Sequence, residues 1–262
     1  MKKILIIFLI LLMLPGLVSC KKVGADSLYS EIAKNTLALE YIKFNLSVKS
    51  TVTSENSTLT IPTDSEIKII NQDGKITYLS TSALRFMIED KMARVTLQHY
   101  YKDGILYQSA GDVKMKHELS AEKLWEGNNN AETLILKLPS ELLTDVKVET
   151  KKKVSSFELT VSSKNITDDL KEQLDQIINL YSEVKYDGGN YTYGDLDVAV
   201  KSTNDGFIST CTALFTTTGT VSGVETTETI SFAYEVVNPG NYFALDAPYS
   251  ASEYEEGEFT VK

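Results

Sequence analysis

Two cysteines and two histidines are the side chains of this 262-residue chain best suited to nucleophilic or metal chemistry. His99 and His117 have no cysteine or glutamate nearby at a zinc-like spacing, and structural zinc needs four ligands. Cys211 lies in a strand-like run, where a buried and inert thiol is the expected role. Of these four side chains, only Cys20 lies in a sequence pattern that indicates a chemical modification.

The segment before Cys20 has the layout of a secretory signal. A basic start at Lys2-Lys3 precedes an apolar run from Ile4 to Leu14, and small residues follow. The apolar stretch is broken by Pro15-Gly16 and is too short for a bilayer crossing, which needs about 20 apolar residues. We therefore expect a cleaved signal over residues 1–19 and not a transmembrane anchor.

Leu17, Val18 and Ser19, directly before Cys20, resemble the lipobox of bacterial lipoproteins. In that family the cysteine thiol receives a diacylglycerol and the preceding peptide is removed. The resemblance implies that Cys20 becomes the lipid-bearing first residue on the outer side of a cell membrane, followed by a tether over residues 20–26. Each buried acyl methylene contributes about 0.8 kcal/mol, so two or three chains give stable anchoring. Cleavage at an ordinary peptidase site stays open as an alternative.

The charge balance excludes two classes of partner. The chain carries 36 acidic and 26 basic side chains, for a net charge of −10. Nucleic acid requires clustered Lys and Arg, and docking on anionic lipid requires a basic face. The single basic run, Lys151-Lys152-Lys153, lies between two strand-like stretches and is expected to be a solvated turn.

Period-two alternation predicts a large antiparallel sheet. Phe44, Leu46 and Val48 alternate with polar residues, which is typical of a strand with one dry face. Asp73-Gly74 and Asp103-Gly104 are hairpin signals between further strands. The dry face needs cover, and helices are the available elements. One helix is expected to start at Asp26 or Ser27, and a stronger one at Thr167.

We therefore predict an α+β fold: a strongly curved antiparallel sheet, an unclosed β-barrel, with two or three helices packed in its concave face. Residues 27–250 would form one β-rich domain, and two similar halves meeting near residues 145–167 stay open as an alternative. Residues 251–262 are predicted to be an acidic C-terminal tail that lies loosely on the surface.

The expected order of elements resembles the LolA/LppX-like lipoprotein carriers. The run Tyr100-Tyr101-Lys102-Asp103-Gly104-Ile105-Leu106-Tyr107 and the closing Asn238-Pro239-Gly240 are also similar to uncharacterised small lipoproteins of Gram-positive bacteria. The resemblance implies that an acyl chain or another apolar molecule is held between sheet and helices. The candidate lining residues are apolar positions of three strands: Phe44, Leu46, Val48, Phe157, Leu159, Val161, Phe232 and Tyr234.

No sequence motif of a hydrolase, a P-loop protein or a metalloprotease is present, so we expect neither an enzyme nor a cofactor or metal site. Three functions remain: a membrane-anchored binder or carrier of an apolar ligand, an envelope interaction or structural module with a packed core, and a wall-glycan binder. The last hypothesis draws on the fourteen tyrosines and the single Trp125.

Overall fold

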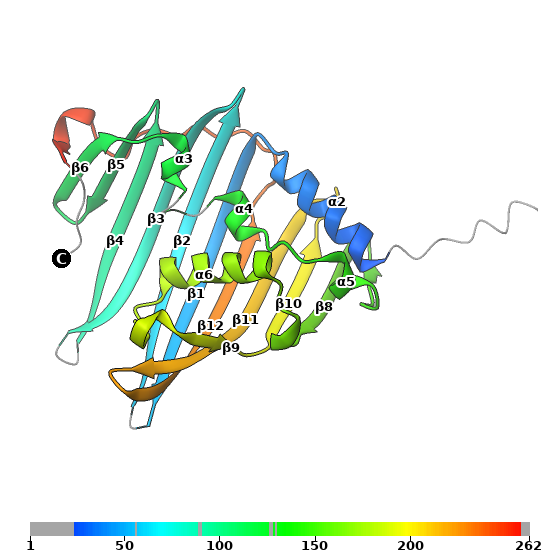
Figure 1. Cartoon of the computed structure of the whole chain (residues 1–262). Coiled ribbons are helices and arrows are strands. Elements are labelled where there is room, and N and C mark those ends of the chain that lie inside the picture. Colours follow the sequence, from blue (N-terminus) through cyan, green and yellow to red (C-terminus); the bar gives the residue numbers. More distant parts are fainter. Residues whose placement is uncertain (1–23, 56, 89–90, 126–127, 129, 258–262) are drawn as a thin grey trace, which may run out of the picture.

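The computed structural model describes residues 24–257 except residues 56, 89–90, 126–127 and 129. Its described strands form one sheet of 13 strands (Figure 1). The first half of the chain gives a meander of β1 (Tyr41–Ser54), β2 (Ser57–Gln72), β3 (Lys75–Ile88), β4 (Lys91–Lys102), β5 (Ile105–Ala110) and β6 (Val113–Glu118). The second half gives β7 (Glu149–Lys151), β8 (Val154–Val161), β9 (Tyr191–Tyr193), β10 (Leu196–Ser202), β11 (Ile208–Val221) and β12 (Val224–Val236).

The two meanders join along β1 and β12, which are antiparallel neighbours in the middle of the sheet. The sheet order is β13-β6-β5-β4-β3-β2-β1-β12-β11-β10-β8-β7, and β9 pairs with β11 off this path. β13 (Glu255–Glu256) is parallel to β6, and the other described pairings are antiparallel. β6 and β7 therefore lie far apart, and the sheet stays open.

Turn chemistry and alternation explain these strands. Asp73 and Gly74 adopt φ angles of 50° and 77°, as a two-residue hairpin turn with both central residues left-handed requires. In β1, Phe44, Leu46 and Val48 are buried, whereas the residues between them are exposed. A one-residue slip would expose the whole apolar set, so this register is strongly specified. Lys152 and Lys153 form the solvated turn expected between β7 and β8.

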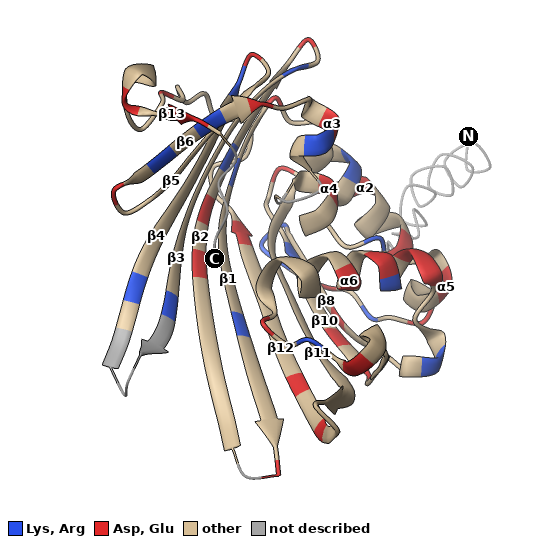
Figure 2. Cartoon of the chain, turned by 60° about the vertical axis from the view of Figure 1, so that its left-hand side comes forward, with Lys and Arg blue, Asp and Glu red and all other residues tan. Residues whose placement is uncertain are grey.

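Five helices of the described chain cover one face of the sheet (Figures 1 and 2), which we call the inner face. They are α2 (Ala25–Leu37), α3 (Ala121–Leu124), α4 (Ala131–Leu134), α5 (Ser140–Leu143) and α6 (Asp168–Tyr181). The predicted α+β fold, an open curved sheet with helices on its dry face, is confirmed. Two helices are long and three are single turns.

The predicted helix start is confirmed for α6 and is wrong for α2. Thr167 caps α6, because its Oγ1 accepts a hydrogen bond from the backbone N–H of Leu170 at 3.4 Å. The expected start of α2 at Asp26 or Ser27 is wrong. Gly24 is the N-cap and no side chain caps the helix, so α2 extends into the predicted tether. Ala25 is fully buried, and tertiary packing therefore adds the extra residues.

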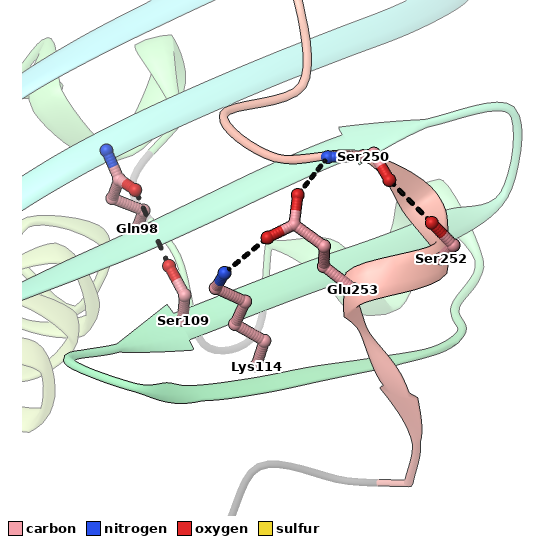
Figure 3. A network of polar contacts seen from close by, with 6 residues as sticks. All are labelled: Gln98, Ser109, Lys114, Ser250, Ser252 and Glu253. Carbon is pink, nitrogen blue, oxygen red and sulfur yellow. Dashed lines mark hydrogen bonds and ion pairs between the residues drawn. The ribbon is translucent and has the colours of Figure 1, made fainter.

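The C-terminal segment is docked as far as residue 257, so the prediction of a loosely lying tail is wrong for residues 251–257. The ring of Tyr254 packs on Tyr107 with centroids 5.0 Å apart, and Gly257 N donates to Lys116 O. Glu253 accepts hydrogen bonds from Lys114 Nζ at 2.7 Å and from Ser250 N at 3.0 Å (Figure 3). These contacts cover the free edge of β6, which would otherwise invite pairing with another chain.

Candidate functional site

The predicted lipid-attachment residue Cys20 and its preceding Leu17, Val18 and Ser19 lie outside the described residues. The lipid anchor therefore stays a prediction. Within the part of the chain that the structure describes, no helix is long and apolar enough to cross a membrane.

The eight candidate lining residues share the inner face of the sheet. Leu46 lies opposite Tyr234 and Val48 opposite Phe232, across β1 and β12. Seven of the eight are at most 3% exposed, and Leu159 is half-buried. They pack with the helices as one hydrophobic core, which holds the sheet to its cover. Their role as ligand lining stays a prediction.

An open apolar groove lies on the other side of α2, between that helix and residues 132–143. Its volume is about 680 Å³, within the range of small-molecule sites. Its apolar lining comprises Tyr29, Ala33, Leu37, Ala38, Ile135, Leu136, Leu138 and Leu143, and its polar rim comprises Asp26, Ser30, Lys34, Glu132, Lys137 and Ser140. We call it the α2 groove.

Helical periodicity places one wall of the α2 groove. Tyr29, Ala33 and Leu37 follow one another at a spacing of four residues, so they form a stripe along α2. Leu37 is 42% exposed, a large value for a leucine beside a core. Ile32 and Thr36, from the adjacent side of the helix, are buried against the sheet. One helix thus contributes both to the closed core and to the open groove.

The opposite wall runs from α4 to α5 through an irregular link, and two side chains fasten its backbone. The Gln173 side chain of α6 donates from Nε2 to Glu132 O at 2.8 Å and to Ile135 O at 3.3 Å. Its Oε1 accepts from Lys137 N at 2.6 Å. The Tyr29 hydroxyl donates to Leu136 O. Buried backbone groups in single helical turns and irregular links need such partners, so Gln173 and Tyr29 position this wall.

The role of Gln173 was not predicted from the sequence. The available signal was an amide on the buried face of an amphipathic helix, among Leu170, Leu174 and Ile177. A polar residue at such a position needs a partner inside the protein. Its partners lie 36 to 41 residues away in the chain, and no local pattern gives them.

A second groove of about 400 Å³ adjoins the first, between α3, α4 and α6. Glu132 and Lys137 line both grooves. The other lining residues are Glu122, Trp125, Asn130, Thr133, Asp169, Glu172, Gln173 and Gln176. We call it the polar groove. The acidic residues of α6 are visible in Figure 2.

Two solved structures align with most of this chain at low sequence identity. LprF from Mycobacterium bovis aligns with 86% of this chain and 97% of its own, at 12% sequence identity and a TM-score of 0.44. A LolA superfamily protein from Nitrosomonas europaea aligns with 82% of this chain and 94% of its own, at 7% identity and a TM-score of 0.25. A LolA superfamily protein is thus among the solved structures that align with this chain.

At the level of sequence, no protein-family model and no curated protein matches the chain.

The surroundings of His99 and Cys211 give both side chains a structural role. His99 Nδ1 lies 2.5 Å from Asn128 Oδ1, and burial lowers the pKa of His99. Cys211 is fully buried, and burial raises the pKa of its thiol to about 12, which disfavours a reactive thiolate. In the described chain, no group of three His, Cys, Asp or Glu side chains could hold a metal ion.

Proposed function

We propose that this protein is a membrane-anchored, extracytoplasmic lipoprotein that binds an apolar ligand, such as an acyl chain, in the α2 groove. Cys20 carries the anchor and the domain performs no catalysis. The observation that carries the proposal is the groove itself: an open apolar concavity of about 680 Å³ with a charged rim. Apolar concavities with few polar groups are the usual sites for small apolar ligands.

The position of the groove relative to the anchor supports the same function. Gly24, the N-cap of α2, follows Cys20 by four positions, and four Cα–Cα steps can span at most about 14 Å when fully extended. Asp26, Tyr29 and Ser30 line the groove within the first turns of α2. The short tether would therefore keep the groove near the bilayer surface, which shortens the path of an acyl chain through water, where its apolar surface is unfavourable.

Photo-crosslinking tests the site. The full chain, made with its own signal, is reconstituted in phosphatidylcholine nanodiscs and exposed to a long-chain fatty alcohol bearing a diazirine in its chain. We expect labelled peptides from residues 29–38 and 132–143. Labelling confined to other surfaces, or spread evenly over the domain, would contradict the proposal.

A matched pair of variants controls this experiment. Leu37 and Leu214 are both 42% exposed, but Leu214 lies on β11 away from the groove. Leu37→Gln should reduce labelling about five- to ten-fold, because it removes apolar contact with the ligand. Leu214→Gln should leave labelling unchanged. Incorporation of labelled palmitate that is lost in Cys20→Ala tests the anchor separately.

A second candidate function is an interaction or structural module of the cell envelope. The packed interior favours this second function, since the apolar residues on the inner face of the sheet, Phe44 and Tyr234 among them, form a core beneath the helices. Crosslinking on intact cells would then capture one specific protein partner, and the α2 groove would take up no lipid probe.

A further inference from the structure

We propose that the α2 groove holds one acyl chain of the protein's own anchor, so that the lipid on Cys20 and an outside ligand compete for the same apolar surface. This inference rests on the proposed function, which assigns the anchor to Cys20 and an apolar ligand to the α2 groove. It adds the identity of one ligand, and it couples occupancy of the groove to the hold of the protein on the membrane.

One end of the α2 groove lies at the start of α2, which is the part of the domain nearest to Cys20 along the chain. Asp26, in the first turn of α2, lines the groove. The start of this helix lies beside α5, whose Leu143 lines the opposite wall (Figure 1). The Cα atoms of Cys20 and Gly24 are at most about 14 Å apart. This end of the groove is therefore within reach of a lipid on Cys20.

The length of the α2 groove matches that of one acyl chain. Asp26 and Ala38 both line the groove, and the helical rise of about 1.5 Å per residue puts about 18 Å between them. The hydrocarbon core of a bilayer is about 30 Å thick, so one acyl chain spans about 15 Å of it. An acyl chain that enters beside Asp26 would therefore extend to the far end of α2, where Leu37 is 42% exposed.

The apolar wall of α2 suits one chain and not two. Tyr29, Ala33 and Leu37 form a single stripe along the helix, and the polar residues Ser30 and Lys34 lie beside it on the rim. An acyl chain parallel to α2 would contact the three stripe residues in turn and remove the exposed leucine from water. The remaining acyl chains of the anchor would stay in the bilayer.

Attachment to the same molecule favours this occupant over a free amphiphile. A short tether gives an effective concentration in about the millimolar range, whatever the supply of free ligand. A single acyl chain in a bilayer holds a protein only marginally and reversibly, whereas two chains hold it stably. Withdrawal of one chain therefore weakens a two-chain anchor, and an outside ligand that displaces this chain from the groove restores the hold on the membrane.

Metabolic labelling tests this assignment. Cells that make the full chain with its own signal are fed palmitate bearing a diazirine in its chain, and the purified protein is reconstituted as single copies in phosphatidylcholine nanodiscs. After irradiation, mass spectrometry locates the crosslinks between the Cys20 lipid and the rest of the same chain. We expect most of them in residues 29–38 and 132–143, and we expect excess unlabelled long-chain fatty alcohol to reduce them by competition.

The matched leucine pair controls this experiment as well. Leu37→Gln should lower the yield of crosslinks in the α2 groove about five-fold, because the stripe loses apolar contact with the chain. Leu214→Gln, at a leucine of the same exposure on β11, should leave that yield unchanged.

Crosslinks from the Cys20 lipid to bilayer lipid alone, crosslinks confined to other surfaces of the domain, or equal yields in the two variants would each overturn the inference. In these cases, labelling of the α2 groove by the free diazirine alcohol keeps the binding of an outside ligand. Absence of the label from Cys20 would overturn the anchor and the inference together. If neither the Cys20 lipid nor the free alcohol labels the groove, the inference and the proposed function both fail.

Discussion

The two sides of α2 contact apolar surfaces of opposite kinds. Toward the sheet, Tyr29 and Ile32 join a core in which Phe44 and Phe232 are fully buried. Toward residues 132–143, Ala33 and Leu37 face a groove that stays open to solvent. The core is closed because side chains from the sheet interdigitate with the helix. The groove is open because its far wall is a backbone segment fixed at a distance by hydrogen bonds.

The closed core therefore supplies stability, whereas the open groove is the candidate binding surface. In a close-packed interior any change of volume or charge is costly. An open groove can gain or lose side-chain volume at little cost, and it is therefore the part of the apolar surface that is free to bind a ligand. Three predictions test this separation, in order of decreasing effect, and a fourth concerns the docked C-terminal segment.

The largest effect is expected from a charge in the core. Val48, 1% exposed and opposite Phe232, becomes a buried and unpaired carboxylate in Val48→Asp, which should cost about 3–5 kcal/mol in the free energy of unfolding. Thr51→Asp, on the outer face of the same strand, should cost less than about 0.5 kcal/mol. Equal thermal stability of the two variants would refute the assignment of faces.

An alanine-to-phenylalanine substitution should have different effects in the core and in the α2 groove. Ala213, 2% exposed in the core, has no room for a ring, so Ala213→Phe should lower the free energy of unfolding by about 1–3 kcal/mol. Ala33→Phe fills the α2 groove instead; it should leave stability nearly unchanged and abolish labelling by the diazirine alcohol. Urea unfolding and crosslinking on both variants check this contrast, which fails if Ala33→Phe is the more destabilising change.

Removing the amide that fastens the groove wall should have an intermediate effect. Gln173→Ala leaves the backbone groups of Glu132, Ile135 and Lys137 without their partner, which should cost about 2 kcal/mol. It should also lower crosslinking to residues 132–143, because the wall is no longer held. Asn179→Ala, exposed on the same helix, is the control and should change neither quantity. Unchanged labelling in Gln173→Ala would mean that the wall does not depend on α6.

The smallest effect concerns the docked C-terminal segment. The hydrogen bond from Lys114 and that from the backbone of Ser250 lower the pKa of Glu253. Its contribution is therefore present above the ordinary glutamate pKa of about 4.3 and is lost as the pH falls through the lower folded-state value. Amide exchange over residues 250–257, relative to intrinsic rates, should rise on acidification below about pH 4.5. Glu253→Gln should remove this pH dependence and leave global stability unchanged.

Much of the fold could be predicted from local patterns. Alternation in β1, the turns at Asp73-Gly74 and Asp103-Gly104, and the cap at Thr167 each specify an element through interactions between near neighbours. The eight apolar residues could be assigned to one face, since β1, β8 and β12 alternate with period two over these positions. The docking of residues 251–257 could not be predicted, because its partners Lys114 and Lys116 lie about 140 residues away.

The sequence by itself determined the strands, their faces and the need for a helical cover, because these follow from periodicity and turn chemistry. It also determined the acidic surface and the lipobox-like segment. Only the tertiary structure decided which apolar residues became a closed core and which lined an open groove. That difference depends on how Gln173 and Tyr29 hold a distant backbone segment beside α2, and such contacts leave no periodic trace in the chain.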